Sequence, residues 1–150
     1  MQKIAAVIVL AVFACGAANA SDKTDAMAVV HKWVDAFNKE DGKTGSSYCA
    51  DGVVILDDFA PHIWQGSGAC ASWYKDYEAF AAKGQIRAAS VALGKARHLD
   101  VDSGYAYLVM PVTLSYTKAD KPISDKAIVT MSLKKASSEW QITGWAWADQ

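Results

Sequence analysis

The hydrophobic pattern of this chain changes near Gly84 from a mainly helical period to a period of two, and this change limits the folds open to it. Before Gly84, apolar residues recur at helical spacing in two segments, whereas after it they alternate with polar residues. Strands joined by short turns pair antiparallel, so we predict an α+β fold in which a curved antiparallel sheet wraps around N-terminal helices. The predicted strands are residues 85–99 (interrupted near Gly94), 105–118, 126–135 and 140–148.

The residues before Gly84 predict two longer helices with a strand between them. Apolar stripes at helical spacing predict a first helix from Asp22 or Thr24 to Lys39 and another over residues 67–82. The residues between them favour a short helix at 43–49, a strand at 53–57 and a loop at 58–66.

The first twenty residues have the features of a cleaved export signal. Lys3 precedes an apolar run at residues 4–14, and Ala18-Asn19-Ala20 forms a small-x-small cleavage site. We therefore predict a signal peptide at residues 1–20, a single domain at residues 21–150, and a periplasmic or secreted protein. A lipid-modified Cys15 is the alternative, although the residues before it fit a lipobox poorly.

The charge of the chain argues against nucleic acids and membrane surfaces as partners. Its formal net charge is −1 at pH 7, and removal of Lys3 with the signal leaves 14 cations against 16 acids, a net charge of −2. A near-neutral chain without a basic cluster lacks the attraction that phosphate backbones and anionic lipids require. The sequence also lacks zinc, P-loop and dinucleotide-binding motifs, so we expect no metal or cofactor.

Cleavage of the signal would leave two cysteines, Cys49 and Cys70. In an oxidising compartment such an even pair predicts a disulfide, which would close a loop of roughly 20 residues. Two buried free thiols are the alternative.

Two adjacent carboxylates are the main candidates for a functional site. Asp57 and Asp58 follow the apolar run at residues 53–56, and apolar walls that desolvate a carboxylate raise its pKa. Strand alternation would point the two side chains to opposite faces, so at most one should face a cavity. His62 follows in the next loop and is a candidate for proton transfer with an acid. The alternative is a strand end where all three side chains meet water.

Aromatic residues are numerous enough both to fill a core and to line a cavity. Alternation along residues 140–148 places Trp145 and Trp147 on one side of the strand, with Trp140 and Ile142 on or near the other. Either side is a candidate for the inner face, and a plain core is the alternative use of all these rings. The candidate cavity walls are Trp33, Trp64, Tyr77, Tyr107, Trp145 and Trp147.

Three parts of the sequence resemble segments of one known protein family. They are Ala28–Asn38, Ala50–Val53 with Trp64-Gln65-Gly66, and Trp140-Gln141-Ile142 with Trp145. With these segments the chain resembles members of the nuclear transport factor 2-like superfamily, which includes ketosteroid isomerases and SnoaL-type cyclases. The resemblance implies a cone-shaped, cystatin-like α+β barrel with an apolar pocket, and a homodimer through the outer sheet face. It also implies Asp57 as a general base, to within one position, so that Asp58 is the alternative base. Trp33 stands where the steroid isomerases use a tyrosine donor, and residues 128–131 hold no acid where they use a protonated aspartate.

These observations predict a domain that binds a small apolar molecule in an aromatic cone, with Trp33, Asp57 or Asp58, and His62 as the polar groups that fix it. The first alternative is an isomerase or lyase in which Asp57 removes a proton next to a carbonyl group. The second is a non-catalytic dimeric interaction module whose cavity is filled by its own side chains.

Overall fold

The computed structural model describes residues 14–150, with side chains from Ala20 onward, so most of the predicted signal peptide (residues 1–20) lies outside the described residues. The helices are α1 (Ala14–Asn38), α2 (Gly42–Ser47) and α3 (Ala69–Lys83). The strands are β1 (Cys49–Leu56), β2 (Ile63–Gln65), β3 (Ile86–Leu93), β4 (His98–Asp102), β5 (Tyr105–Lys118), β6 (Lys121–Ala136) and β7 (Glu139–Asp149). No helix in this part of the chain has the length and apolar character needed to cross a membrane.

The predicted α+β fold is confirmed, with one correction to the strand directions. The sheet has the order β2-β1-β7-β6-β5-β3, and β4 pairs with β5 beside β3. All of these pairs are antiparallel except β1 with β7, which run parallel. The parallel pair was not predicted, because short turns fix the direction of consecutive strands only, and β1 and β7 are the first and the last strand of the described residues.

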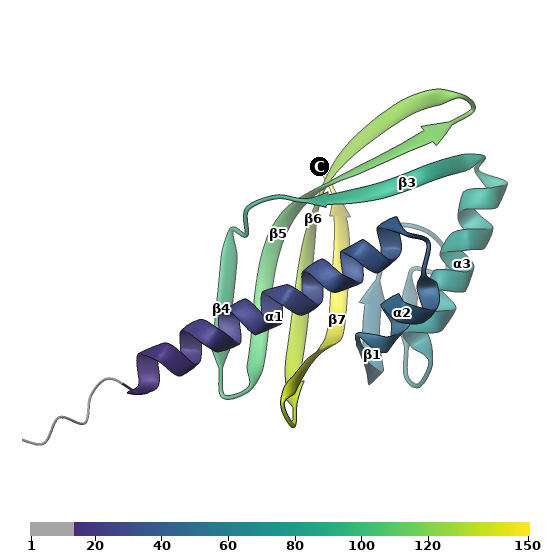
Figure 1. Cartoon of the computed structure of the whole chain (residues 1–150). Coiled ribbons are helices and arrows are strands. Elements are labelled where there is room, and N and C mark those ends of the chain that lie inside the picture. Colours follow the sequence, from purple (N-terminus) through teal and green to yellow (C-terminus); the bar gives the residue numbers. More distant parts are fainter. Residues whose placement is uncertain (1–13) are drawn as a thin grey trace, which may run out of the picture.

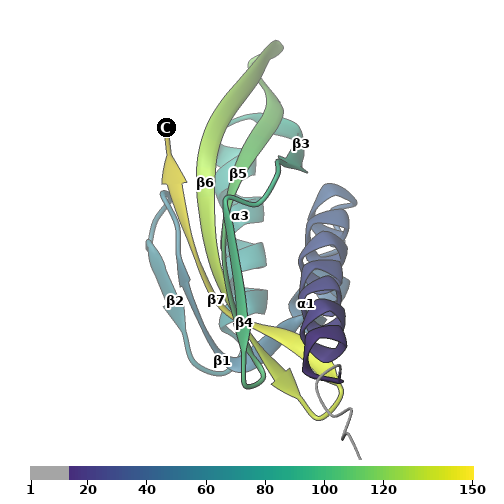
Figure 2. The same cartoon turned by 90° about the vertical axis from the view of Figure 1, so that its left-hand side faces the viewer.

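The sheet is curved and α1 lies across its concave face, as Figures 1 and 2 show from two directions. Helix α3 packs against β1, β2 and β3 and closes one end of the concave side. The apolar stripe predicted for the first helix faces the sheet, since Val30, Trp33, Val34 and Phe37 are all buried. His31 is exposed, as predicted. The cone is therefore formed by a sheet, one long helix and one closing helix.

Several element boundaries differ from those predicted. Helix α1 begins at Ala14 instead of Asp22 or Thr24. The segment predicted as one strand at 85–99 forms β3 and β4, and the predicted loop at 58–66 contains β2. Strand β1 ends at Leu56, one residue before the predicted end. That last difference matters for the site, because it leaves Asp57 outside the strand.

A bulge in β7 places four aromatic and apolar side chains on one face. Leu133 lies opposite Ile142 while Ser132 lies opposite Gly144, so one residue of β7 is left without a partner. The extra residue reverses the alternation. Trp140, Ile142 and Trp145 are therefore all buried on the inner side, and Trp147 lines the cavity from the same side. The predicted separation of Trp145 and Trp147 from Trp140 and Ile142 is wrong.

The predicted disulfide between Cys49 and Cys70 is present. It joins the first residue of β1 to the first turn of α3, with 6.4 Å between the Cα atoms and 21 residues of sequence separation. The bond fixes α3 over the strand that leads into Asp57 and Asp58.

Candidate functional site

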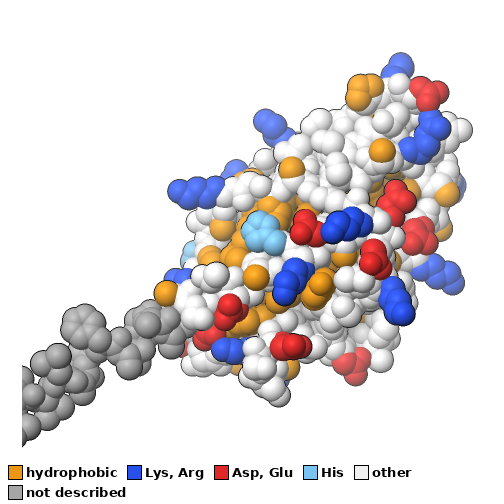
Figure 3. Space-filling model, viewed as in Figure 1, with side chains coloured by type: hydrophobic (Ala, Val, Ile, Leu, Met, Phe, Trp, Pro, Cys, Tyr) orange, Lys and Arg blue, Asp and Glu red, His pale blue; other side chains and the backbone are white. Residues whose placement is uncertain are grey.

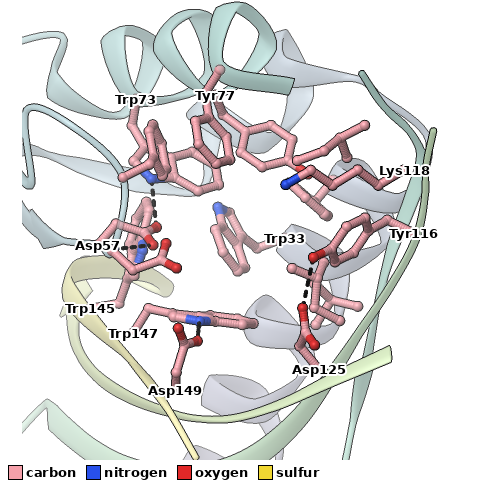
Figure 4. Close-up of a pocket in the computed structure, with 17 residues that line it drawn as sticks. Trp33, Asp57, Trp73, Tyr77, Tyr116, Lys118, Asp125, Trp145, Trp147 and Asp149 are labelled. Carbon is pink, nitrogen blue, oxygen red and sulfur yellow. Dashed lines mark hydrogen bonds between the residues drawn. The ribbon is translucent and has the colours of Figure 1, made fainter. Parts of the chain in front are cut away.

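A cavity of about 140 Å³ lies between α1, α3 and the inner face of the sheet (Figure 4). It is open to the surface at the end where β1 and β7 finish and where the β5–β6 hairpin begins to extend beyond the cone. The residues that line it are Trp33, Phe37, Asp57, Asp58, Phe59, Trp73, Tyr77, Phe80, Ile86, Val91, Leu114, Tyr116, Lys118, Asp125, Trp145, Trp147 and Asp149.

Aromatic rings form most of the inner wall. Trp33 contacts Trp145 with 4.9 Å between ring centroids and Trp73 with 6.0 Å. Trp73 stacks on Tyr77 at 5.7 Å with 16° between the ring planes. Such contacts hold the rings in fixed orientations, which favours a preformed cavity over one that collapses.

Asp57 is the most perturbed acid of the cavity. Its Oδ2 accepts a hydrogen bond of 2.8 Å from Trp73 Nε1, and its Oδ1 accepts one of 2.9 Å from the main-chain N–H of Asp58. Burial is the main cause that raises the pKa of Asp57 to about 7, and the two hydrogen bonds act in the opposite direction. Near neutral pH the carboxyl group can therefore either donate or accept a proton.

Trp33 brings an unused hydrogen-bond donor into the same cavity. Its side chain is only 7% exposed, and its Nε1 is buried without any hydrogen-bond partner. In Figure 4 Trp33 lies between the walls that carry Asp57 and Lys118, with its nitrogen on the side of Trp73 and Tyr77. A buried N–H without an acceptor costs about 1–3 kcal/mol, so an acceptor supplied by a ligand would be favourable at this point.

The mouth of the cavity carries more acids than bases. Asp58, Asp125 and Asp149 line it together with one lysine, Lys118. Burial raises the pKa of Asp58, and the negative charge of Asp149 adds to this effect. The Tyr116 hydroxyl donates a bond of 2.8 Å to Asp125, and Trp147 Nε1 donates one of 2.9 Å to Asp149.

Six of the predicted site residues line this cavity: Trp33, Asp57, Asp58, Tyr77, Trp145 and Trp147. The prediction that at most one of the two aspartates faces the cavity is wrong. The backbone leaves the strand conformation after Leu56, so strand alternation no longer applies to Asp57 and Asp58. Burial raises the pKa of Tyr77 to about 12, so its hydroxyl stays neutral at physiological pH.

Three predicted site residues lie elsewhere. His62 is exposed, and its Nδ1 lies 3.2 Å from the main-chain oxygen of Asp57, not from the carboxyl group. Trp64 is buried behind the cavity wall, where its Nε1 donates a bond of 2.8 Å to Asp76. Tyr107 is 48% exposed because it lies on the outer face of β5, between the inward-facing Ala106 and Leu108.

Several lining residues were not predicted. Trp73 belongs to the same helical stripe as Tyr77, and that shared stripe was a signal that pointed to it. Tyr116, Lys118, Asp125 and Asp149 come from the ends of β5, β6 and β7. Nothing in the local sequence indicates that these ends meet the loop after β1.

No protein-family model matches the sequence. No curated protein matches it either. Solved structures do match the fold. An NTF2-like protein with a cystatin-like fold from Novosphingobium aromaticivorans superimposes with a TM-score of 0.73 at 14% identity, covering 90% of this chain and 86% of that one. A ketosteroid isomerase-like protein from Erwinia carotovora atroseptica gives 0.68 at 13% identity, covering 85% and 95%.

A third structure, from Catenulispora acidiphila in complex with S-DNPA, gives a TM-score of 0.71 at 8% identity, covering 87% of this chain and 94% of that one. At such low identities the likeness concerns the fold alone. The chain has the NTF2-like, cystatin-like fold that ketosteroid isomerase-like proteins also have, as the resemblance in sequence implied.

Proposed function

We propose that this protein binds a small, largely apolar molecule in the aromatic cavity and fixes it through Trp33 and Asp57. The observation that carries the proposal is the unpartnered indole N–H of Trp33, buried in a cavity that also contains the desolvated carboxyl group of Asp57. One group is a donor without an acceptor. The other can donate or accept near pH 7, so together they suit a ligand oxygen such as a hydroxyl or carbonyl.

The size of the cavity supports a ligand no larger than one ring with a substituent at the mouth. Its volume of about 140 Å³ is close to that of an engineered apolar cavity of about 150 Å³ that binds benzene. The surrounding indole and phenol rings would contact the faces of a planar ligand. The fold itself is compatible with such a role, since the Catenulispora acidiphila neighbour was solved in complex with S-DNPA.

A binding measurement with 3-tert-butylphenol tests the proposal. The hydroxyl of this phenol can accept a hydrogen bond from Trp33 Nε1–H and donate one to the carboxyl group of Asp57. Trp33→Phe should weaken binding by about fivefold, because it removes one hydrogen bond and keeps an aromatic ring. Trp140→Phe is the matched control, since Trp140 Nε1 is also buried without a partner but Trp140 does not line the cavity. Equal loss in both variants, or no binding to the unaltered protein, would refute the proposal.

The raised pKa of Asp57 favours a second candidate, an isomerase or lyase. The ionised carboxyl would remove a proton next to a carbonyl group whose oxygen accepts from Trp33 Nε1, and would return that proton at a second carbon. Cyclohex-3-enone in D₂O is a direct probe. Catalysis predicts deuterium uptake and formation of the conjugated isomer, both lost in Asp57→Asn. A protein that binds the ketone without exchange would have the binding role alone.

We also propose that the chain is exported and cleaved after Ala20. The bonded Cys49–Cys70 pair supports an oxidising compartment. Cleavage would keep the ion pair between Asp22 and Lys135 and the fully buried Ala26, which hold α1 to the sheet. A mature N-terminus at Ser21 in a periplasmic or culture-medium fraction is the expected result, and an intact N-terminus there would contradict it.

Homodimerisation through the outer sheet face stays a prediction. Val54, Leu56 and Ile63 are exposed apolar residues on β1 and β2. If the protein is dimeric in solution, substituting these residues tests whether this face forms the interface.

A further inference from the structure

We infer that the ligand of this cavity is an organic cation, whose apolar body and hydrogen-bond acceptor enter the cone while its ammonium group lies among the carboxylates at the mouth. The inference rests on the proposed binding function and adds the charge and polarity of the ligand to it.

The tertiary structure gathers four carboxylates around one opening. Asp57 and Asp58 directly follow β1, and Asp149 ends β7. The parallel pairing of these strands, in which Leu56 lies opposite Ala146, carries all three to the same place. Asp125 faces them from β6, and Figure 4 shows Asp57, Asp125 and Asp149 around the cavity.

None of these carboxylates forms an ion pair within the part of the chain that the structure describes. Its two ion pairs join Arg87 to Asp120 and Lys135 to Asp22, both outside the cavity. On the face seen in Figure 3, acidic and basic side chains are interspersed, whereas the cavity lining has four acids and the single base Lys118. The raised pKa of Asp58 reflects this excess of acidic over basic side chains, because the negative charge of Asp149 is one of its causes. A ligand cation would relieve this repulsion.

Trp33 is the second, independent sign of a ligand. Its indole ring lines the cavity and its N–H is buried without an acceptor, and an ammonium group cannot satisfy that N–H because both groups are donors. The buried end of the ligand must therefore carry an acceptor, such as a hydroxyl or carbonyl oxygen. The cationic end must lie nearer the mouth, beside Asp58 and Asp149.

The aromatic wall is suited to a cation as well as to an apolar body. Trp147 lines the cavity next to Asp149, and its Nε1–H is bonded to that carboxylate. Ring faces of tryptophan attract ammonium groups, most strongly where water is partly excluded. An indole ring with a carboxylate held at its edge is therefore a combination that favours a substituted ammonium group over a strongly hydrated metal ion.

Three probes of similar size separate the charge of the ligand from its shape. The cation 3-hydroxyphenyltrimethylammonium and the neutral 3-tert-butylphenol differ only in a nitrogen for a carbon, and 3-hydroxybenzoate carries the opposite charge. In calorimetric titrations at pH 7.5 and low ionic strength, the cation should bind about tenfold more tightly than the neutral phenol. Added salt should weaken the binding of the cation alone.

Two substitutions of opposite sign test where the charge lies. Asp149→Asn should weaken binding of the cation about fivefold, and Lys118→Gln should strengthen it by a smaller factor, with binding of 3-tert-butylphenol nearly unchanged in both. Asp100→Asn is the control, since Asp100 is an exposed acid on β4 that does not line the cavity. It should leave binding of both probes unchanged.

The outcomes distinguish this inference from the function on which it rests. If 3-tert-butylphenol binds as tightly as the cation, or if 3-hydroxybenzoate binds best, the inferred charge is wrong while the binding function stands. If none of the three probes binds, both are refuted. If Asp100→Asn weakens binding of the cation as much as Asp149→Asn does, the affinity for the cation comes from the overall surface charge and not from a site at the mouth.

Discussion

The substitution Asp57→Asn should change the stability of this protein in opposite directions at low and high pH. Asp57 has a folded-state pKa of about 7 against an ordinary value of 3.8, because burial penalises its charged form. Between these two values the folded state binds more protons than the unfolded state. The free energy of unfolding therefore falls as the pH rises from about 4 to 7, and the full penalty is present above pH 7.

The size of the effect follows from the shift and from the two hydrogen bonds. Asp57 has a pKa of about 7 instead of 3.8. At about 1.36 kcal/mol for each pH unit between these values, the ionised carboxyl costs about 4 kcal/mol above pH 7. Asparagine has no such penalty, but its single oxygen can accept from only one of the two donors, Trp73 Nε1 and the main-chain N–H of Asp58. Losing one bond costs about 1–2 kcal/mol. Asp57→Asn should therefore destabilise the fold by about 1 kcal/mol at pH 4 and stabilise it by about 2–3 kcal/mol at pH 8.

Urea unfolding followed by tryptophan fluorescence, with the disulfide intact, measures this difference at the two pH values. Asp51→Asn is the control, because Asp51 is exposed on β1 and its substitution should have the same small effect at both pH values. Asp58→Asn should show a weaker form of the same pH dependence, since burial also raises the pKa of Asp58. A stability change for Asp57→Asn that does not vary with pH would show that this carboxyl is not desolvated, and the proposed site would lose its acid.

Three further variants test how the site is held, each by its free energy of unfolding in urea. Replacing Cys49 and Cys70 together by Ser should lower the free energy of unfolding by about 3 kcal/mol, because the bond closes a loop of about 21 residues; a loss below 1 kcal/mol would mean that the unfolded chain is little constrained by the bond. Gly45→Ala should destabilise by about 1–3 kcal/mol, since the added Cβ would lie 2.0 Å from the Tyr74 hydroxyl oxygen. Gly144→Ala should cost a similar amount, about 1–3 kcal/mol, because its Cβ would lie 2.8 Å from a carbonyl oxygen of β1 and would disturb the β1–β7 pairing that positions the carboxylates. A neutral result for either glycine would show that the contact relaxes freely.

The proposed chemistry depends on two groups that are costly in the empty cavity. The carboxyl of Asp57 is desolvated and the indole N–H of Trp33 has no acceptor. Each would be less costly with a ligand oxygen between them, so ligand binding should stabilise the fold in addition to the contact area it buries. This is the physical reason why the two side chains, which α1 and the end of β1 contribute separately, are the centre of the candidate site.

The sequence by itself determined the class of the fold and much of the cavity wall. The apolar stripe of α1, the stripe of α3 that contains Trp73 and Tyr77, and the strict alternation along β5 and β6 are local signals, because helices and strands bury a face at a fixed period. The even number of cysteines predicted for the mature chain pointed to the Cys49–Cys70 bond, and the apolar run before Asp57 marked that residue as a candidate. These features depend on residues that are close together in the chain.

Only the tertiary structure decided which side chains meet. The parallel pairing of β1 with β7 brings Asp149 to Asp58, and the bulge near Thr143 turns Trp145 and Trp147 inward together with Ile142. Neither the pairing partner nor the position of a bulge is encoded by a local period, because both are chosen by packing against elements far away in the sequence. Packing also decides which of the two faces of β5 is the inner one: Ala106 and Leu108 are buried, so Tyr107 faces outward and is not part of the cavity.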